Sequence, residues 1–314
     1  MTIPPWAAAT PARRAAYRLF GPPLAYLLHL RPSEWPIMAG HTMVGYLLAV
    51  GIPGALRGEA LGPGVLGVIL WVVFLNGGTL AINSAFDNDE GDIGYLRQPP
   101  PPPRYLLAIS LGLMLAGQVA AFLLPLEYVW AYAACFLLSV LYSVPPLRLK
   151  AVAGADWVIN MWGFGTLTCY AGWAATGVPL TTPGLLVLLA FCPLFAALYP
   201  LTQLYQFEED ARRGDRTLAL RLGMARSLDV ALAAMVLAFV LFLAAGYRAG
   251  WGTGGVDSMR WAGILLAALV WLLVLLPWRW RFSTMSSDQH QRGMYHALGA
   301  WAVTDAVVLL GFAL

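Results

Sequence analysis

The stretch Asn83-Ser-Ala-Phe-Asp87-Asn-Asp89-Glu90-Gly-Asp92 follows an apolar run, residues 64–82, that is long enough to cross a lipid bilayer. Ionisable side chains are costly at a membrane face, so the four acidic residues in this stretch require a physical reason. A second acidic cluster, Glu208-Glu209-Asp210, ends another apolar run, residues 185–205. Two such clusters on two membrane helices predict a site for Mg²⁺ and a diphosphate at the mouth of a helical bundle.

Composition places the chain among membrane proteins. Hydrophobic residues fill 60% of the 314 positions, and charged residues only 11%. Nine apolar segments, each about long enough to span a bilayer, predict an all-α polytopic membrane protein with nine transmembrane helices. They cover residues 35–53, 64–85, 105–125, 128–146, 157–177, 184–205, 228–248, 260–278 and 296–314. We expect one domain over residues 1–314, in which residues 1–34 form a cytoplasmic or interfacial segment.

The basic residues predict how the chain is oriented in the membrane. With the N-terminus inside, 16 of the 19 Lys and Arg residues lie on the cytoplasmic side, as the positive-inside rule requires. Both acidic clusters then face the cytoplasm, and an odd number of spans places Leu314 outside. This bias explains the net charge of +3 without a nucleic-acid partner. One Lys against 18 Arg favours a bacterial source, and hence a bacterial inner membrane.

The first acidic cluster has the spacing of a metal site. Asn83 and Asp87 are four residues apart and share one face of a helix, whereas Asp89 and Asp92 point elsewhere if the helix continues. The acids can converge only if the helix ends shortly after Asp87, which Gly91 favours. Amide and carboxylate oxygens suit Mg²⁺, which binds one or two carboxylates together with substrate phosphates. The alternative is a solvated acidic loop.

The second acidic cluster carries arginines next to its acids. Gln206, Asp210 and Gly214 recur every four residues, and Arg212, Arg213 and Arg216 accompany them. Arginine binds phosphate oxygens through two parallel hydrogen bonds, so these residues suit a diphosphate. The positive-inside rule alone would also explain them.

A third element, Tyr142-Ser-Val-Pro-Pro-Leu-Arg148-Leu-Lys150, closes the fourth apolar segment. It brings a phenol, a guanidinium and an ammonium group together within nine residues. This group could hold a diphosphate and protonate or shield it as it leaves. A plain helix stop followed by positive-inside charges is the alternative interpretation.

Together the three elements resemble the motifs of the UbiA-type intramembrane prenyltransferase superfamily. Its first motif, Asn-x₃-Asp-x₃-Asp, is matched at Asn83 and Asp87, with Gly91 at the third position and Asp92 one residue late. Its second motif, Asp-x₃-Asp-x₃-Gly-x-x-Thr-Leu, is matched at Asp210, Gly214, Thr217 and Leu218, with Gln206 in place of the first Asp. The Tyr-Ser-x-Pro-Pro-x-Arg-x-Lys motif is matched from Tyr142 to Lys150, and Arg31-Pro32 is similar to the family's opening.

The resemblance implies nine transmembrane helices around a central cavity that opens sideways to lipid. It implies Mg²⁺-dependent transfer of a prenyl group from an allylic polyprenyl diphosphate to a lipophilic or aromatic acceptor, with two Mg²⁺ ions bridging the diphosphate. The expected metal ligands are Asn83, Asp87, Asp92, Gln206 and Asp210, with Asp89 and Glu209 also in the cofactor site. The expected substrate-binding residues are Arg31, Arg97, Tyr142, Arg148, Lys150, Asn160 and Arg216. The expected catalytic residues are Asp87, Asp210, Arg148, Lys150 and Tyr142.

Two rival functions stay open from the sequence. A UbiA-type terpene cyclase acts on a polyprenyl diphosphate without an acceptor, and the altered motif positions Gly91 and Gln206 leave room for this chemistry. A membrane carrier would place acids near the bilayer midplane on broken helices, whereas here they cluster at helix ends. Two polar residues within apolar segments, His41 and Asn160, either pack within the bundle or position the acceptor.

Overall fold

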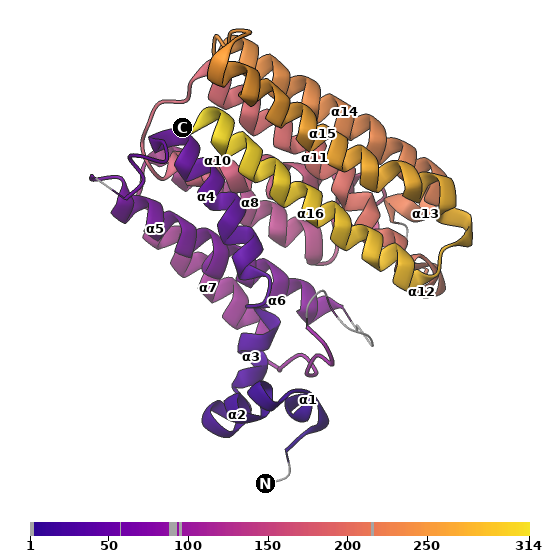
Figure 1. The fold of residues 1–314 in the computed structure, drawn as a ribbon. Helices are drawn as coiled ribbons and strands as arrows, with labels where there is room; N and C mark the ends of the chain where they lie inside the picture. Colours follow the sequence, from indigo (N-terminus) through magenta and orange to yellow (C-terminus); the bar gives the residue numbers. More distant parts are fainter. Residues whose placement is uncertain (1–2, 57, 88–92, 94–95, 215–216) are drawn as a thin grey trace.

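The computed structural model describes residues 3–56, 58–87, 93, 96–214 and 217–314, without the side chains of Glu209 and Arg213. Regular structure in these residues is helical, apart from one isolated bridge between Ile93 and Leu96. The long helices pack side by side into a bundle, and three short N-terminal helices extend beyond it (Figure 1). The all-α prediction is therefore confirmed for the described part of the chain.

The helices follow the predicted apolar segments along the chain. Three short helices come first: α1 (Pro5–Ala8), α2 (Pro11–Phe20) and α3 (Leu24–His29). The bundle contains α4 (Trp35–Val50), α5 (Leu61–Ile69), η1 (Leu70–Asn76), α6 (Gly77–Phe86), α7 (Leu106–Ala121), α8 (Leu126–Ser143), α9 (Ala155–Asn160), η3 (Met161–Leu167), α10 (Thr168–Ala174), α11 (Thr182–Leu204), α14 (Met224–Arg248), α15 (Gly255–Arg281) and α16 (Ser287–Phe312). Short connecting helices are η2 (Leu149–Ala151), α12 (Phe207–Arg213), α13 (Leu218–Leu222) and η4 (Phe282–Thr284).

Six helices in the described residues are long and apolar enough to cross a membrane, as expected of an integral membrane protein. They cover 61–86, 126–143, 182–204, 224–248, 255–284 and 287–312, and two shorter apolar helices cover 35–50 and 106–121. The first predicted segment is shortened because Gly51 adopts a φ of 73° and ends α4 at Val50. The last begins earlier than residue 296 because Ser286 and Gln289 form a capping box. A count of nine spans stays a prediction.

Two helical runs of the bundle contain a π-helical section. The run α5–η1–α6 is continuous from Leu61 to Phe86, and its middle section, η1, is π-helical. The run α9–η3–α10 has the same construction around η3. Such wide turns are rare in proteins and are found most often at functional sites. They mark η1 and η3 as the sections of the bundle to inspect for a site.

Helices α4 and α10 cross with their backbones in close contact. A Cβ atom built on Gly45 would lie 1.6 Å from the Cys169 carbonyl oxygen, and one built on Gly172 would lie 1.8 Å from the Thr42 carbonyl oxygen. Small residues permit two membrane helices to approach this closely. The association of helices in lipid has no hydrophobic driving force and relies on close packing. The crossing joins α4 to the helical run that includes η3.

Gly45→Ala should therefore lower the melting temperature of the purified protein in detergent, with a cost of about 1–3 kcal/mol for overpacking. Gly40→Ala on the same helix is the matched control, because nothing lies within 4 Å of a Cβ atom at that position. We expect the control to melt at the wild-type temperature or slightly above it. Melting is monitored by tryptophan fluorescence. Equal melting temperatures for the two variants would contradict the close crossing of α4 and α10.

Candidate active site

The third sequence element lies against the first acidic motif. The Lys150 ammonium donates to Asn83 Oδ1 at 2.6 Å and forms an ion pair with Asp87 Oδ1, and the Arg148 guanidinium donates to the same Asp87 oxygen at 3.3 Å. Helix α6 ends at Phe86, so Asp87 is its extended C-cap, with a φ of −94° and a ψ of 130°. The expected helix end and the shared face of Asn83 and Asp87 are thus both observed.

The backbone after α8 explains how these cations reach α6. Helix α8 ends at Ser143, whose hydroxyl donates to Asn83 Oδ1 at 3.3 Å. Arg148 then adopts a left-handed conformation, with a φ of 36°, and begins the single turn η2 that carries Lys150. Two cations therefore surround the one carboxylate of Asp87. Lysine and arginine side chains in this position suit an anionic ligand such as a diphosphate.

The second motif forms the short helix α12. Gln206 is its N-cap, Asp210 is buried, and Gly214 closes it with a φ of 76°. The end of α6 and helices α12 and α13 lie at the end of the bundle away from the C-terminus (Figure 1). Both acidic motifs therefore belong to the same end of the molecule.

The N-terminal segment also reaches this end of the bundle. Burial raises the pKa of Tyr205, just before α12, to about 12, and the charges of Glu34 and Asp210 act in the same direction. Glu34 pairs at 3.5 Å with Arg31, which is buried and has a φ of 50°. Two guanidinium nitrogens of Arg31, Nε and Nη2, are buried and have no hydrogen-bond partner among the described residues. They remain able to bind an anion.

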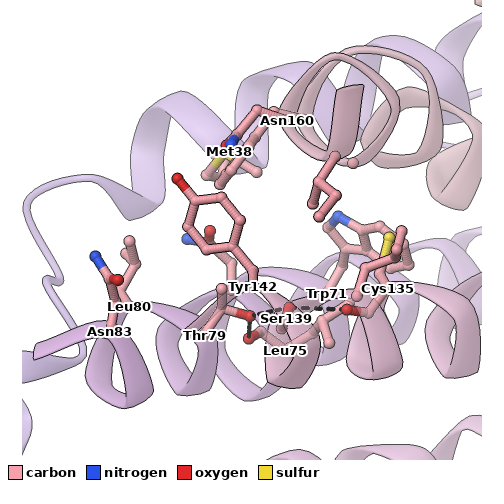
Figure 2. A pocket seen from close by; sticks show the side chains of 15 residues that line it. Met38, Trp71, Leu75, Thr79, Leu80, Asn83, Cys135, Ser139, Tyr142 and Asn160 are labelled. Atoms are coloured by element: carbon pink, nitrogen blue, oxygen red, sulfur yellow. Dashed lines mark hydrogen bonds between the residues drawn. The ribbon is translucent and has the colours of Figure 1, made fainter. Parts of the chain in front are cut away.

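A cavity of about 160 Å³ extends from Asn83 into the bundle (Figure 2). Both π-helical turns contribute to its wall, η1 through Trp71, Leu75 and Asn76 and η3 through Gly163 and Phe164. The remaining wall comes from Met38, Thr79, Leu80, Asn83, Cys135, Leu138, Ser139, Tyr142, Ile159 and Asn160. The cavity thus begins beside the Lys150–Asp87 pair and continues between mostly apolar side chains. A charged head group and an apolar tail would both find a matching environment.

A buried carboxylate that the sequence analysis did not select, Asp156, lies behind this cavity. It is 0% exposed and accepts hydrogen bonds from the Gly154 amide at 2.8 Å, Gln203 Nε2 at 3.1 Å, the Tyr199 hydroxyl at 3.3 Å and the Leu218 amide at 3.4 Å. Asp156 also accepts at its backbone oxygen from the Asn160 amide, at 2.7 Å. Its signal in the sequence is a single acid at the start of an apolar segment.

The other predicted residues fall outside this cluster or outside the described residues. Arg97 is exposed, and its carbonyl oxygen accepts from Arg13 Nη1 at 2.7 Å. His41 contacts the Gly165 carbonyl oxygen at 2.9 Å and Asp305 at 3.3 Å, so it is satisfied within the bundle. Asp89, Asp92, Arg216 and the Glu209 side chain lie outside what the structure describes.

The donor chemistry of the site fits Mg²⁺. Asn83, Asp87, Gln206 and Asp210 supply only amide and carboxylate groups, whose oxygens are the ligands that Mg²⁺ prefers. Within the described residues, no three His, Cys, Asp or Glu side chains gather where they could hold a metal by themselves. Mg²⁺ commonly takes one or two carboxylates and completes its shell with water and phosphate oxygens.

Comparison with known proteins identifies relatives of this fold. The model of the UbiA prenyltransferase family matches residues 36–299. The lycopene elongase/hydratase of Haloferax volcanii is 31% identical over 241 residues, which make up 73% of this chain and 76% of that protein. A UbiA homolog from Archaeoglobus fulgidus bound to GPP and Mg²⁺ has a TM-score of 0.60 at 19% identity, covering 90% of this chain and 99% of that one. A structure described as digeranylgeranylglyceryl phosphate synthase in membranes has a TM-score of 0.67 at 15% identity, covering 92% and 98%.

Mg²⁺ together with inorganic diphosphate should raise the melting temperature of the wild-type protein. A ligand that binds only the folded state adds about 2.7 kcal/mol at a hundredfold excess over its Kd. Asp87→Asn should abolish most of this rise, because it removes the charge of an expected metal ligand. Asp229→Asn is the matched control, since Asp229 also pairs with an arginine, Arg279, at 2.6 Å but lies exposed on α14. A full rise in the Asp87 variant would argue against a metal at this carboxylate.

Proposed function

Since this chain belongs to the UbiA prenyltransferase family, we propose that it transfers a prenyl group from an allylic diphosphate to a lipophilic acceptor within the membrane. The observation that carries the proposal is the cavity that begins at Asn83, beside the Lys150–Asp87 pair. As acceptor we propose a linear polyene of the lycopene type, because a relative at 31% identity is a lycopene elongase/hydratase. An aromatic acceptor is the less favoured alternative.

We assign the metal to the two acidic motifs. Asn83 and Asp87 on one side, and Gln206 and Asp210 on the other, would hold Mg²⁺, and we propose two ions. Asp89, Asp92 and Glu209 would provide further oxygen ligands on the same two segments. Bound with a diphosphate, Mg²⁺ supplies positive charge that stabilises the leaving group. Because Gln206 is neutral, the ion on its side would have one fewer anionic ligand.

The chain's own cations would act on the diphosphate directly. Lys150 and Arg148 already lie at the mouth of the cavity, and Arg31 has two buried nitrogens without partners in the described residues. Fixed positive groups stabilise the charge that develops on the leaving diphosphate as its C–O bond breaks, without any reorganisation cost at that moment. We propose that Arg97 and Arg216 serve the same diphosphate.

The cavity predicts a short donor. An apolar cavity of about 150 Å³ in another protein binds benzene, which has six carbon atoms. The cavity of about 160 Å³ here therefore matches a single C5 unit, so we propose dimethylallyl diphosphate as the donor. A longer polyprenyl chain would have to displace Trp71, which is 2% exposed at the far side from Asn83. Cyclisation needs a longer chain folded on itself, so this volume favours transfer over cyclisation.

The membrane arrangement completes the proposal. We propose that the chain forms one domain of nine spans in a bacterial inner membrane, with its N-terminus and both acidic motifs on the cytoplasmic side and its C-terminus outside. Support comes from the distribution of basic residues and from the overlap of every predicted apolar segment with a helix or continuous helical run. A water-soluble diphosphate would then enter from the cytoplasm, while an apolar acceptor would enter from the lipid.

The reaction is tested by diphosphate release from the purified protein in lipid. With Mg²⁺ and lycopene present, we expect diphosphate to be released from dimethylallyl diphosphate and a product to form that is heavier than lycopene by one C5 unit. With EDTA in place of Mg²⁺, we expect no diphosphate release. Asp87→Ala should lower the rate by about 100-fold or more, as loss of a group that stabilises transition-state charge commonly does. Asp229→Ala, which removes an exposed carboxylate on α14, should retain the wild-type rate.

Three results of this assay would change the proposal. Product formed without lycopene from a C15 or C20 donor would establish the cyclase instead. Release that depends on an aromatic acceptor would replace the polyene. A folded protein that releases no diphosphate from any donor, with Mg²⁺ and every acceptor tested, would overturn prenyl transfer.

Trp71→Leu should shift donor preference from dimethylallyl diphosphate toward geranyl diphosphate, because it enlarges the cavity at its far end. We expect the ratio of kcat/KM values for the two donors to change by at least about tenfold, the effect of roughly 1.4 kcal/mol in a pocket. Trp130→Leu is the matched control, since Trp130 is 72% exposed on α8 and does not line the cavity. An unchanged ratio in the Trp71 variant would show that this cavity does not hold the prenyl tail.

A further inference from the structure

The structure points to a route for the proton that prenyl transfer to a carbon acceptor must release. We propose that Asp156 is the final acceptor of this proton, which reaches it from the cavity through the hydroxyls of Tyr142 and Tyr199. The inference rests on the proposed function, because it concerns the last step of that reaction. Nothing in the three sequence motifs requires it, since Asp156 and Tyr199 lie outside them.

Both carboxyl oxygens of Asp156 accept hydrogen bonds. Its Oδ1 accepts from the Gly154 amide, and its Oδ2 accepts from Gln203, Tyr199 and the Leu218 amide. A protonated carboxyl group would need an acceptor for its own hydrogen, whereas an ionised one only accepts. Four donors therefore favour the carboxylate, although it is fully buried. Asp156 therefore ends the route as a hydrogen-bond acceptor.

The hydrogen bond from Tyr199 to Asp156 sets the direction of the hydrogen bonds that lead to the cavity. Because the Tyr199 hydroxyl donates to Asp156 at 3.3 Å, the Tyr142 hydroxyl, 3.2 Å from that of Tyr199, must be the donor in their mutual hydrogen bond. The Asn160 side chain lies within hydrogen-bonding reach of Tyr142. Figure 2 shows the Tyr142 ring at the cavity, with its hydroxyl on the side of Asn160. A hydroxyl oxygen has two acceptor lone pairs, so the Tyr142 oxygen can accept one hydrogen bond besides the one from Asn160.

The step balances in atoms and electrons. The donor's C–O bond breaks and its electron pair leaves with the diphosphate; a π pair of the acceptor then forms the new C–C bond and leaves a tertiary cation. A C–H bond next to that cation gives its electrons to a new C=C bond and its proton to the Tyr142 oxygen. Tyr142 passes its own hydroxyl proton to Tyr199, and Tyr199 passes its proton to Asp156. Both tyrosines end neutral, as they began, and no oxidant or reductant is needed.

Other polar groups of the cavity serve this step less well. Lys150 and Arg148 are cations and cannot accept a proton. The Thr79 and Ser139 hydroxyls are hydrogen-bonded to each other at 2.8 Å and to carbonyl oxygens of their own helices. These hydrogen bonds do not lead to a carboxylate that could take the proton. The leaving diphosphate is the remaining rival, because its oxygens can also take a proton. The experiment has to separate this rival from the tyrosine route.

Tyr199→Phe is the decisive variant, because it removes only the middle hydroxyl and leaves Asp156 with three donors. The probes are dimethylallyl diphosphate and lycopene with Mg²⁺, and two quantities are measured: diphosphate release and the ratio of alkene product to water-captured, hydroxylated product. We expect this ratio to fall by about 100-fold, the lower end of what one acid–base group contributes, while release falls by less than about threefold. Tyr46→Phe removes another buried hydroxyl, which bonds the Ala55 carbonyl oxygen at 2.7 Å, and should change neither quantity.

Asp156→Asn tests the same ratio of alkene to hydroxylated product. The melting temperature of this variant shows whether the variant protein is folded. We expect the same fall in the alkene fraction. An unchanged ratio in Tyr199→Phe would overturn the tyrosine route and favour the diphosphate as base. The tyrosine route would likewise be overturned if diphosphate release fell in Tyr199→Phe while the ratio of alkene to hydroxylated product stayed constant. That result would indicate a purely structural role for Tyr199. Absence of Mg²⁺-dependent release in the wild-type protein would instead refute the proposed function, so the two failures are distinguishable.

Discussion

The buried carboxylate of Asp156 constrains three parts of the site together. A buried charge without partners costs several kcal/mol, so the four donors around Asp156 must be assembled whenever the protein is folded. They come from the start of α9, from α11 and from the start of α13. The second motif ends at Leu218, whose amide is one of these donors, and Tyr199 contacts the third motif through Tyr142. Formation of the site and folding of this end of the bundle are therefore one event.

The ion pairs of Asp87 give the site a way to accept highly charged ligands. Without ligand, Lys150 and Arg148 neutralise this carboxylate. In the proposed reaction, a diphosphate arriving with Mg²⁺ would bring both an anion for the cations and a cation for the carboxylate. The charges can therefore exchange partners, and none has to be left unpaired in a site with low access to water. This exchange would explain why opposite charges, Asp87 after α6 and Arg148 and Lys150 after α8, meet so close to a membrane.

Apolar segments in the sequence predicted the all-α class, and local spacing predicted one feature of the site. The four-residue step from Asn83 to Asp87 predicted a shared face, and the structure places both residues on Lys150. Asp156 was missed because its partners Tyr199, Gln203 and Leu218 lie 43, 47 and 62 residues away, beyond any local pattern. The π-helical turns were missed for a related reason, since hydropathy does not distinguish a wide turn from an ordinary one.

These wide turns connect the shape of the cavity to its chemistry. Backbone groups in lipid must find partners within the protein, so an irregular turn in a membrane helix is tolerated only where it is enclosed or lines a cavity. Both η1 and η3 line this cavity, and Trp71 on η1 bonds Thr168, the residue that follows η3, at 3.1 Å. This hydrogen bond connects the two irregular sections at the far end of the cavity. In the proposed reaction, a small volume and a fixed wall would limit the access of water to the carbocation, so that proton loss to a nearby oxygen could compete with capture by water.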